Sequence, residues 1–197
     1  MTSLISRLRW PMRGLAAVTV ALVFALASTI SAFAFTLTQL SSDPYTNTTS
    51  QHATEVEPDT LAVGSTIVSA FQVGRFFNGG GSNIGFATST DGGNTFTSGF
   101  LPSSTVFATP AGFYPRGSDA SVAFDAKHGM WLISWLGILS PTGPVDVVVS
   151  RSPDGLRWSG PFVVNNDGHF NDKNWTVCDD TASSPFYGNC YTEFDDN

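Results

Sequence analysis

Four carboxylates stand at the heads of three similar stretches of this sequence. Asp59, Asp119 and Asp172 precede strand-like runs at separations of 60 and 53 positions. Glu57 lies beside the first of them. Carboxylates gathered from separate stretches can act as a general acid, hold a cation such as calcium, or accept hydrogen bonds from sugar hydroxyls. The alternative is that each one caps its own turn through bonds to the backbone. We expect Asp59 and Asp119 to be catalytic. Glu57 and Asp172 are expected to bind ligand.

Two arginines stand where they could face the same axis as these acids. Arg75 follows a strand-like run, and Arg116 stands shortly before Asp119. A guanidinium group binds a carboxylate through two parallel hydrogen bonds. We expect Arg75 to belong to the catalytic group and Arg116 to bind ligand. Arg151 and Arg157 flank a turn and are expected on the outer rim.

The two cysteines predict a disulfide. Cys178 and Cys190 both lie in the part of the chain expected to be exported, where thiols oxidise. A zinc site with His169 is the alternative, but it lacks a fourth ligand at a familiar spacing. No metal site or organic cofactor is therefore predicted, and calcium at the carboxylates is the one candidate ion.

Two turns of similar sequence indicate a repeat. Ser89-Thr-Asp-Gly-Gly-Asn-Thr-Phe96 and Ser152-Pro-Asp-Gly-Leu-Arg-Trp158 begin 63 positions apart, each after a β-rich run. Asp and Ser side chains bond nearby amides, Gly permits a positive φ, and an aromatic ring can pack beneath the loop. Two such turns in matching contexts predict a repeated hairpin module.

The strand-like runs around these turns predict an all-β fold of four-stranded antiparallel modules. The modules span residues 55–115 and 116–168, and a partial third spans 169–197. Repeats of this size are typical of the blades of a β-propeller, of which about two and a half are present. Since a propeller closes as a ring, we expect a fragment of a longer protein. A self-contained sandwich of about ten strands is the competing fold.

The turn pattern Ser-x-Asp-x-Gly-x-x-Phe/Trp resembles the Asp box, or BNR repeat, of the sialidase superfamily. The first copy matches at Ser89, Asp91, Gly93 and Phe96, and the second, one residue shorter, matches at Ser152, Asp154, Gly155 and Trp158. The phrases Glu57-Pro-Asp59, Ser118-Asp119 and Asp172-Lys-Asn-Trp175 look like those of secreted bacterial sialidase-like propellers. This resemblance covers about residues 55–197. It implies that both Asp boxes are structural hairpins between the third and fourth strands of a blade, away from the central site.

The resemblance also implies a glycan-handling protein. A working sialidase has three arginines for the substrate carboxylate, an Asp for acid/base chemistry and a Tyr–Glu nucleophile. This chain lacks the family's FRIP-like arginine motif; its nearest stretch is Phe71-Gln-Val-Gly-Arg-Phe76. A complete arginine triad cannot be assembled, so exo-α-sialidase activity, a glycoside hydrolase activity, is expected of a full-length parent. The alternative is a non-catalytic extracellular binding or scaffold propeller.

The first 34 residues read as an export signal. Three arginines precede an apolar stretch, and Ala32-Phe-Ala34 fits a cleavage site. A retained membrane anchor is the alternative. Cleavage would remove three of nine basic residues and no acidic ones, taking the net charge from −7 to −10. We therefore expect a secreted protein with a loose lead-in over residues 35–54, no membrane contact after cleavage and no binding to nucleic acid.

Overall fold

A computed structural model describes residues 37–197, so the expected export signal lies outside the described residues. Gln39–Asn197 pack together as one unit. Ten strands make up this unit, and all of their extended pairings are antiparallel. No helix in residues 37–197 has the length and hydrophobicity to cross a membrane.

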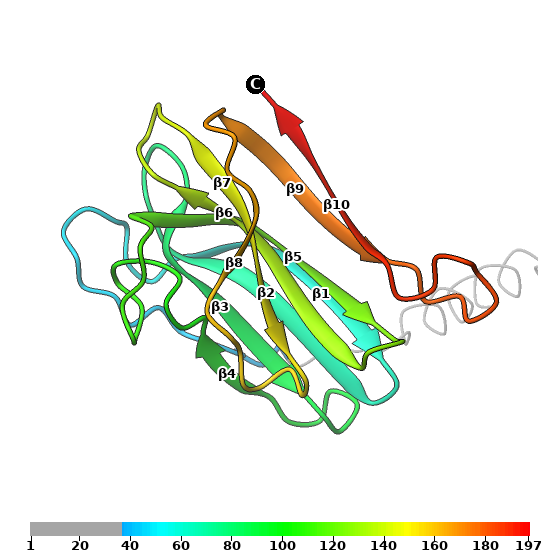
Figure 1. The fold of residues 1–197 in the computed structure, drawn as a ribbon. Helices are drawn as coiled ribbons and strands as arrows, with labels where there is room; N and C mark the ends of the chain where they lie inside the picture. Colours follow the sequence, from blue (N-terminus) through cyan, green and yellow to red (C-terminus); the bar gives the residue numbers. More distant parts are fainter. Residues whose placement is uncertain (1–36) are drawn as a thin grey trace, which may run out of the picture. The chain divides into compact units, whose positions relative to one another are not determined.

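The strands form two complete four-stranded meanders and the start of a third (Figure 1). The first meander comprises β1 (Glu55–Val63), β2 (Thr66–Arg75), β3 (Gly81–Ser89) and β4 (Thr97–Phe100). The second comprises β5 (Arg116–Asp125), β6 (Met130–Ile138), β7 (Val145–Ser152) and β8 (Phe162–Asn165). β9 (Asn171–Cys178) and β10 (Cys190–Asp196) form the third hairpin. The predicted all-β fold of consecutive propeller blades is thereby confirmed.

The first strands of the three blades are neighbours. β5 packs against both β1 and β9. Between the two complete blades, the one backbone pairing within the described residues joins Gly81 to Gly117. The blades therefore meet through side chains, as packed layers rather than as one continuous sheet.

The main core fills the space between the first two blades. Val68, Ile84 and Phe86 of the first blade pack in one cluster with Ile133 and Trp135 of the second. Trp135 is fully buried. The burial of these side chains from both blades provides the hydrophobic stabilisation that the single backbone pairing cannot.

The lead-in segment forms no strand, but it is packed rather than loose. Leu40 and Tyr45 lie against a cluster that includes Phe71 and Val73. The Tyr45 hydroxyl accepts a hydrogen bond of 2.7 Å from the side-chain amide of Asn83. This cluster is separate from the main core, so the lead-in segment adds to the burial of β3, which is buried along its whole length.

The first Ser-Asp-Gly turn joins β3 to β4 and is held by its own side chains. Ser89 Oγ accepts the Gly93 N–H at 2.8 Å, and Asp91 Oδ1 accepts the Thr95 N–H at 2.9 Å. The hydrogen bonds from Thr95 and Ser89 lower the pKa of Asp91 from 3.8 to about 2. The turn is therefore stabilised by an ionised carboxylate that makes local bonds.

The second turn joins β7 to β8 and also reaches the first blade. The Gly155 carbonyl accepts a 2.6 Å hydrogen bond from the Thr88 hydroxyl. Trp158 is buried, with its ring centroid 5.9 Å from that of Phe86. Backbone N–H groups lower the pKa of Asp154 as well. This turn thus shapes a hairpin and forms part of the contact between blades.

The predicted disulfide between Cys178 and Cys190 is present and closes the β9–β10 hairpin. The loop inside it is tied to the β5–β6 turn. Asp180 Oδ1 accepts the Ala126 N–H at 2.8 Å, and Lys127 Nζ donates to the Tyr187 carbonyl at 2.9 Å.

Candidate functional site

The first strand of each blade carries one extra residue near its start. The pairing register shifts between Val56 and Asp59 in β1, and between Ser118 and Ser121 in β5. In β9 the shift lies opposite Glu193 and Asp195. Such β-bulges bend a strand and redirect a side chain.

Each bulge holds a non-glycine residue in a left-handed backbone conformation. The φ angle is 55° at Glu57, 47° at Asp119 and 55° at Lys173. This conformation is unfavourable for such residues by about 1 kcal/mol or more, and it concentrates at functional sites. Three equivalent positions with the same strained geometry therefore mark the region where the blades meet as the candidate site.

These positions correct the register expected from the sequence. The structurally equivalent residues are Glu57, Asp119 and Lys173, rather than Asp59, Asp119 and Asp172. Glu57 and Asp119 are 62 positions apart, close to the 63 that separate Asp91 and Asp154. The alignment expected from the sequence matched positions that are all aspartate. The structure instead matches the positions that share the left-handed backbone conformation of the bulge.

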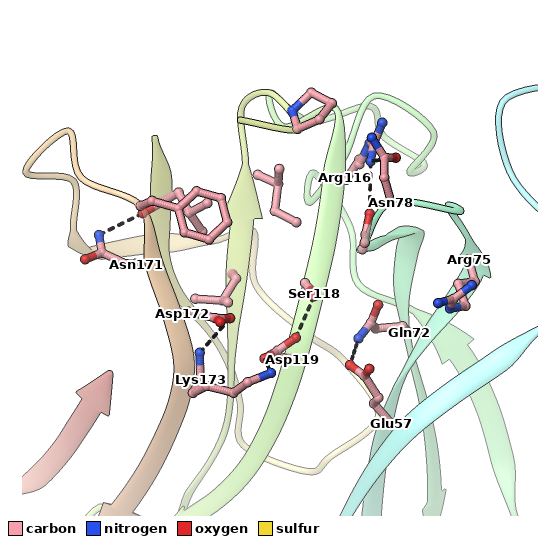
Figure 2. A pocket seen from close by; sticks show the side chains of 17 residues that line it. Glu57, Gln72, Arg75, Asn78, Arg116, Ser118, Asp119, Asn171, Asp172 and Lys173 are labelled. Atoms are coloured by element: carbon pink, nitrogen blue, oxygen red, sulfur yellow. Dashed lines mark hydrogen bonds and ion pairs between the residues drawn. The ribbon is translucent and has the colours of Figure 1, made fainter. Parts of the chain in front are cut away.

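A cavity of about 200 Å³ lies beside the three bulges (Figure 2). Its lining includes five of the six residues predicted for catalysis or ligand binding, namely Glu57, Arg75, Arg116, Asp119 and Asp172. With Lys173, the cavity holds three carboxylates and three cations. The structure thus brings together side chains from all three blades, while their roles in catalysis or binding remain predictions.

The acidic side of the cavity is an interacting group. Ser118 Oγ donates to Asp119 Oδ1 at 2.6 Å, and Lys173 Nζ lies 3.7 Å from Asp119 Oδ2. The side-chain amide of Gln72 donates to Glu57 Oε2. Figure 2 shows this group along one side of the cavity, with Arg116 and Asn78 across from it.

The surroundings of Glu57 and Lys173 raise the pKa of each of these two residues. Burial raises the pKa of Glu57 above 4.5, and the neighbouring charge and hydrogen bond of Asp119 raise it further. Asp119 and then Asp172 raise the pKa of Lys173. Lys173 therefore keeps its positive charge beside Asp119. Glu57, with its raised pKa, is a candidate proton donor in the cavity.

The two arginines differ in how firmly they are held. Arg116 Nη1 donates to Asn78 Oδ1 at 2.7 Å and to the Gly79 carbonyl at 3.0 Å. Its guanidinium carbon also lies 4.2 Å from the centre of the Phe76 ring. Arg75 makes a longer contact of 3.3 Å with Gln51. Arg116 is thus a fixed positive group, and Arg75 is the freer one.

Asp59 is placed differently from the other predicted acids. Its carboxylate accepts the Val122 N–H at 2.7 Å and the Thr60 N–H at 2.8 Å. It lines a neighbouring groove and is not part of the 200 Å³ cavity. The contact with Val122 connects β1 to β5, so the geometry gives Asp59 a role in joining two blades. Its expected catalytic role stays a prediction.

Three polar residues of the site were missed in the sequence. Gln72 is only 2% exposed, and Ser118 and Lys173 contact Asp119. Gln72 could have been found, because it is an amide inside an otherwise apolar strand. A buried polar side chain needs a hydrogen-bond partner, and such a partner indicates a polar site nearby. Lys173 carried no comparable signal, because a lysine beside an aspartate is common on protein surfaces.

No tyrosine lines this cavity within the described residues. The Tyr114 hydroxyl donates to Asp146 Oδ2 at 2.9 Å, and both residues are buried. Burial and the aspartate raise the pKa of Tyr114. This pair is a core contact, packed against Trp135.

One exposed group offers ligands of the kind that bind metals. Asp167, His169 and Asp196 are the only such set of three within residues 37–197. His169 Nδ1 lies 2.6 Å from Asp196 Oδ1, and Asp196 raises the pKa of the imidazole. Calcium at the cavity carboxylates stays a prediction, and Lys173 Nζ lies 3.7 Å from Asp119 Oδ2 there.

Comparisons with known proteins give similarity in fold only. No protein-family model matches the chain, and no curated protein matches it. A Hadza microbial sialidase, Hz136, matches 61% of this chain and 29% of its own, at 19% identity and a TM-score of 0.46. An α-L-arabinanase of Penicillium chrysogenum complexed with arabinobiose matches 71% and 39%, at 11% identity and a TM-score of 0.45.

An exo-β-1,3-galactanase of Phanerochaete chrysosporium with β-1,3-galactotriose is a third example. It matches 78% of this chain and 35% of its own, at 18% identity and a TM-score of 0.43. The chain thus spans about a third of the length of the solved structures that it matches.

Proposed function

We propose that the cavity binds the terminal sugar of a glycan in a secreted, sialidase-like Asp-box propeller. The convergence of Glu57, Asp119 and Lys173 on one cavity, each in the same strained conformation, is the observation that carries this proposal. Strained residues from separate strands that surround one polar cavity are typical of ligand sites. Carboxylates and guanidinium groups in the same cavity suit a ligand with many hydroxyls and a negative charge.

The chemistry that we propose for a longer parent protein is exo-acting glycoside hydrolysis. Glu57, whose pKa is raised, donates a proton to the glycosidic oxygen as the bond from this oxygen to the anomeric carbon breaks. Asp119 takes a proton from a water molecule, whose oxygen forms the new bond to the anomeric carbon, so that the products are the free sugar and the protonated leaving group. Arg116 and Arg75 bind the carboxylate of a terminal sialic acid. Gln72 and Ser118 position the two acids through their hydrogen bonds.

A non-catalytic binding propeller is the second candidate, and a specific observation favours it. No tyrosine lines the cavity in the part of the chain that the structure describes, and two arginines line it rather than three. The same cavity would then hold a glycan without cleaving it.

Two measurements on the exported chain and on a longer parent test these functions. Binding of 3′-sialyllactose and of lactose is compared by calorimetry, and turnover is followed with a fluorogenic sialoside. We expect the sialylated sugar to bind at least tenfold more tightly, which corresponds to about 1.4 kcal/mol. Arg116→Ala should remove this preference, because the proposed charge contact to the ligand carboxylate is lost.

Asp119→Asn separates catalysis from binding. If the parent is an enzyme, this variant should lose turnover while it keeps most of its affinity for the sialylated sugar. Asp195→Asn, an exposed carboxylate on β10 outside the cavity, is the matched control. Binding without turnover in a folded parent would establish the non-catalytic function. Equal affinity for lactose and sialyllactose would overturn recognition of sialic acid.

A further inference from the structure

Trp175 is unlike the other tryptophans of the described chain. Trp131, Trp135 and Trp158 are buried, with 3%, 0% and 9% of their surface exposed, whereas Trp175 is 49% exposed. A half-exposed indole leaves a large apolar face in water, which opposes the hydrophobic stabilisation of the fold. Trp175 lies beside the proposed site, on the first strand of the third hairpin.

Trp175 lies on β9, two residues after Lys173. It lines a groove of about 420 Å³. This groove shares Glu57, Asp119 and Lys173 with the 200 Å³ cavity, so the two spaces adjoin along the bulges. A ligand that extends from the cavity across these bulge residues would therefore meet the indole ring.

The two spaces differ in chemistry in a way that fits successive sugar units. The cavity presents charged groups, which suit hydroxyls and a carboxylate, while the groove adds Pro58, Ala120 and the Trp175 ring. A pyranose has polar edges and an apolar face of C–H groups, and an aromatic ring packs against such a face. An apolar wall beside a polar cavity thus matches a saccharide that extends beyond one unit.

We propose that Trp175 forms a second subsite that takes the apolar face of the sugar next to the terminal one. This inference rests on the proposed function and deepens it: the protein recognises an oligosaccharide rather than a free monosaccharide. Trp175 is here a specificity-determining residue and takes no part in the acid/base chemistry.

The affinity ratio between a longer and a shorter ligand tests the subsite. The probes are 3′-sialyllactose and free sialic acid, titrated by calorimetry against the exported chain. We expect the wild type to bind the trisaccharide at least tenfold more tightly than the monosaccharide. Trp175→Ala should bring this ratio close to one and leave the affinity for the monosaccharide unchanged. Trp175→Phe should retain most of the ratio, since a phenyl ring still offers a flat apolar face.

A matched control separates the subsite from aromatic residues in general. Phe186, 58% exposed in the β9–β10 loop, lines neither the cavity nor the groove. Phe186→Ala should therefore leave the ratio at its wild-type value. An unchanged ratio in Trp175→Ala, with monosaccharide binding intact, would overturn the subsite alone. Failure of the wild type to bind either sugar would overturn the proposed function and the subsite with it.

Acrylamide quenching reports on the ring directly. The quenchable fluorescence lost on Trp175→Phe identifies the signal of Trp175, because the other described tryptophans are buried. We expect 3′-sialyllactose to protect this signal and free sialic acid to leave it unprotected. If Trp175 is already shielded in the ligand-free protein, a protein surface covers it and the subsite is overturned.

Discussion

At the scale of single residues, the three bulge positions decide what the cavity can do. Lys173 lies 3.7 Å from Asp119, and its charge lowers the pKa of Glu57 while burial raises it. The pKa of Glu57 thus depends on the charges of both Asp119 and Lys173. The protonation of Glu57 is therefore a readout of the whole group.

Lys173→Met should raise the pKa of Glu57 further, because the variant removes a positive charge that favours its ionised form. The measurement is an NMR titration of side-chain carboxyl carbons, which is simple because the chain has only three glutamates, Glu55, Glu57 and Glu193. Lys127→Met, at the distant β5–β6 turn, should leave the titration unchanged. A fall or no change in the Glu57 pKa on Lys173→Met would contradict the proposed interaction.

At the scale of elements, each turn and strand combines a local role with a contact to a neighbour. The Ser89 turn has mainly local bonds, which Ser89 Oγ and the ionised Asp91 accept. The Ser152 turn adds the bond between Gly155 and Thr88. The two turns should therefore respond differently to substitution.

Asp91 should stabilise the protein in a pH-dependent way. Its pKa is lowered from 3.8 to about 2, so its contribution is present above its unfolded pKa and is lost as the pH falls through about 2. In urea unfolding between about pH 4 and pH 2, Asp91→Asn should show a shallower loss of stability than the wild type. Asp195→Asn serves as the control, and an unchanged slope in Asp91→Asn would refute the role of the turn carboxylate.

Gly155→Ala should destabilise the protein by about 2–4 kcal/mol, because a positive φ and overpacking act together. Its φ is +72°, and an added Cβ would lie 2.9 Å from Val68 and 3.1 Å from Thr88. Gly92→Ala is the matched control, since its φ is +75° but nothing lies within 4 Å of the new atom. Equal losses in urea unfolding would show that the contact with the first blade contributes nothing.

The elements were predictable from sequence because their signals are local. Alternating apolar residues and Asp-Gly turns locate the strands and hairpins of the first two blades. The bulges were not predictable, because one extra residue leaves no mark in a pattern of period two. The expected alignment of Asp59 with Asp119 failed for this reason. The position of Lys173 beside Asp119 depends on contact between separate blades, which the sequence does not encode locally.

At the scale of the whole molecule, the blades meet through a core and a few polar links. Within the described chain, the single backbone pairing between the two complete blades joins Gly81 to Gly117. Asp59 adds a second link by accepting the Val122 N–H at 2.7 Å. Both links lie near the site, so they hold the two sides of the cavity in position.

Asp59→Ala should lower stability by about 1–3 kcal/mol, because the Val122 N–H loses its acceptor in a largely buried place. Affinity for 3′-sialyllactose should stay within about threefold of the wild-type value, a change of less than 1 kcal/mol. Urea unfolding and calorimetry measure the two effects. Loss of binding or turnover at unchanged stability would instead establish Asp59 as a residue of the active site.

The bond between Thr88 and Gly155 has a consequence for recombining blades of this kind. The second turn belongs by sequence to its own blade, yet its shape is fitted to Val68 and Thr88 of the blade before it. If the second blade were cut out at its strand boundaries and grafted elsewhere, Gly155 would lose its contacts with Val68 and Thr88. The unit to transfer is therefore one blade together with the side chains of the preceding blade that contact its Ser-Asp-Gly turn.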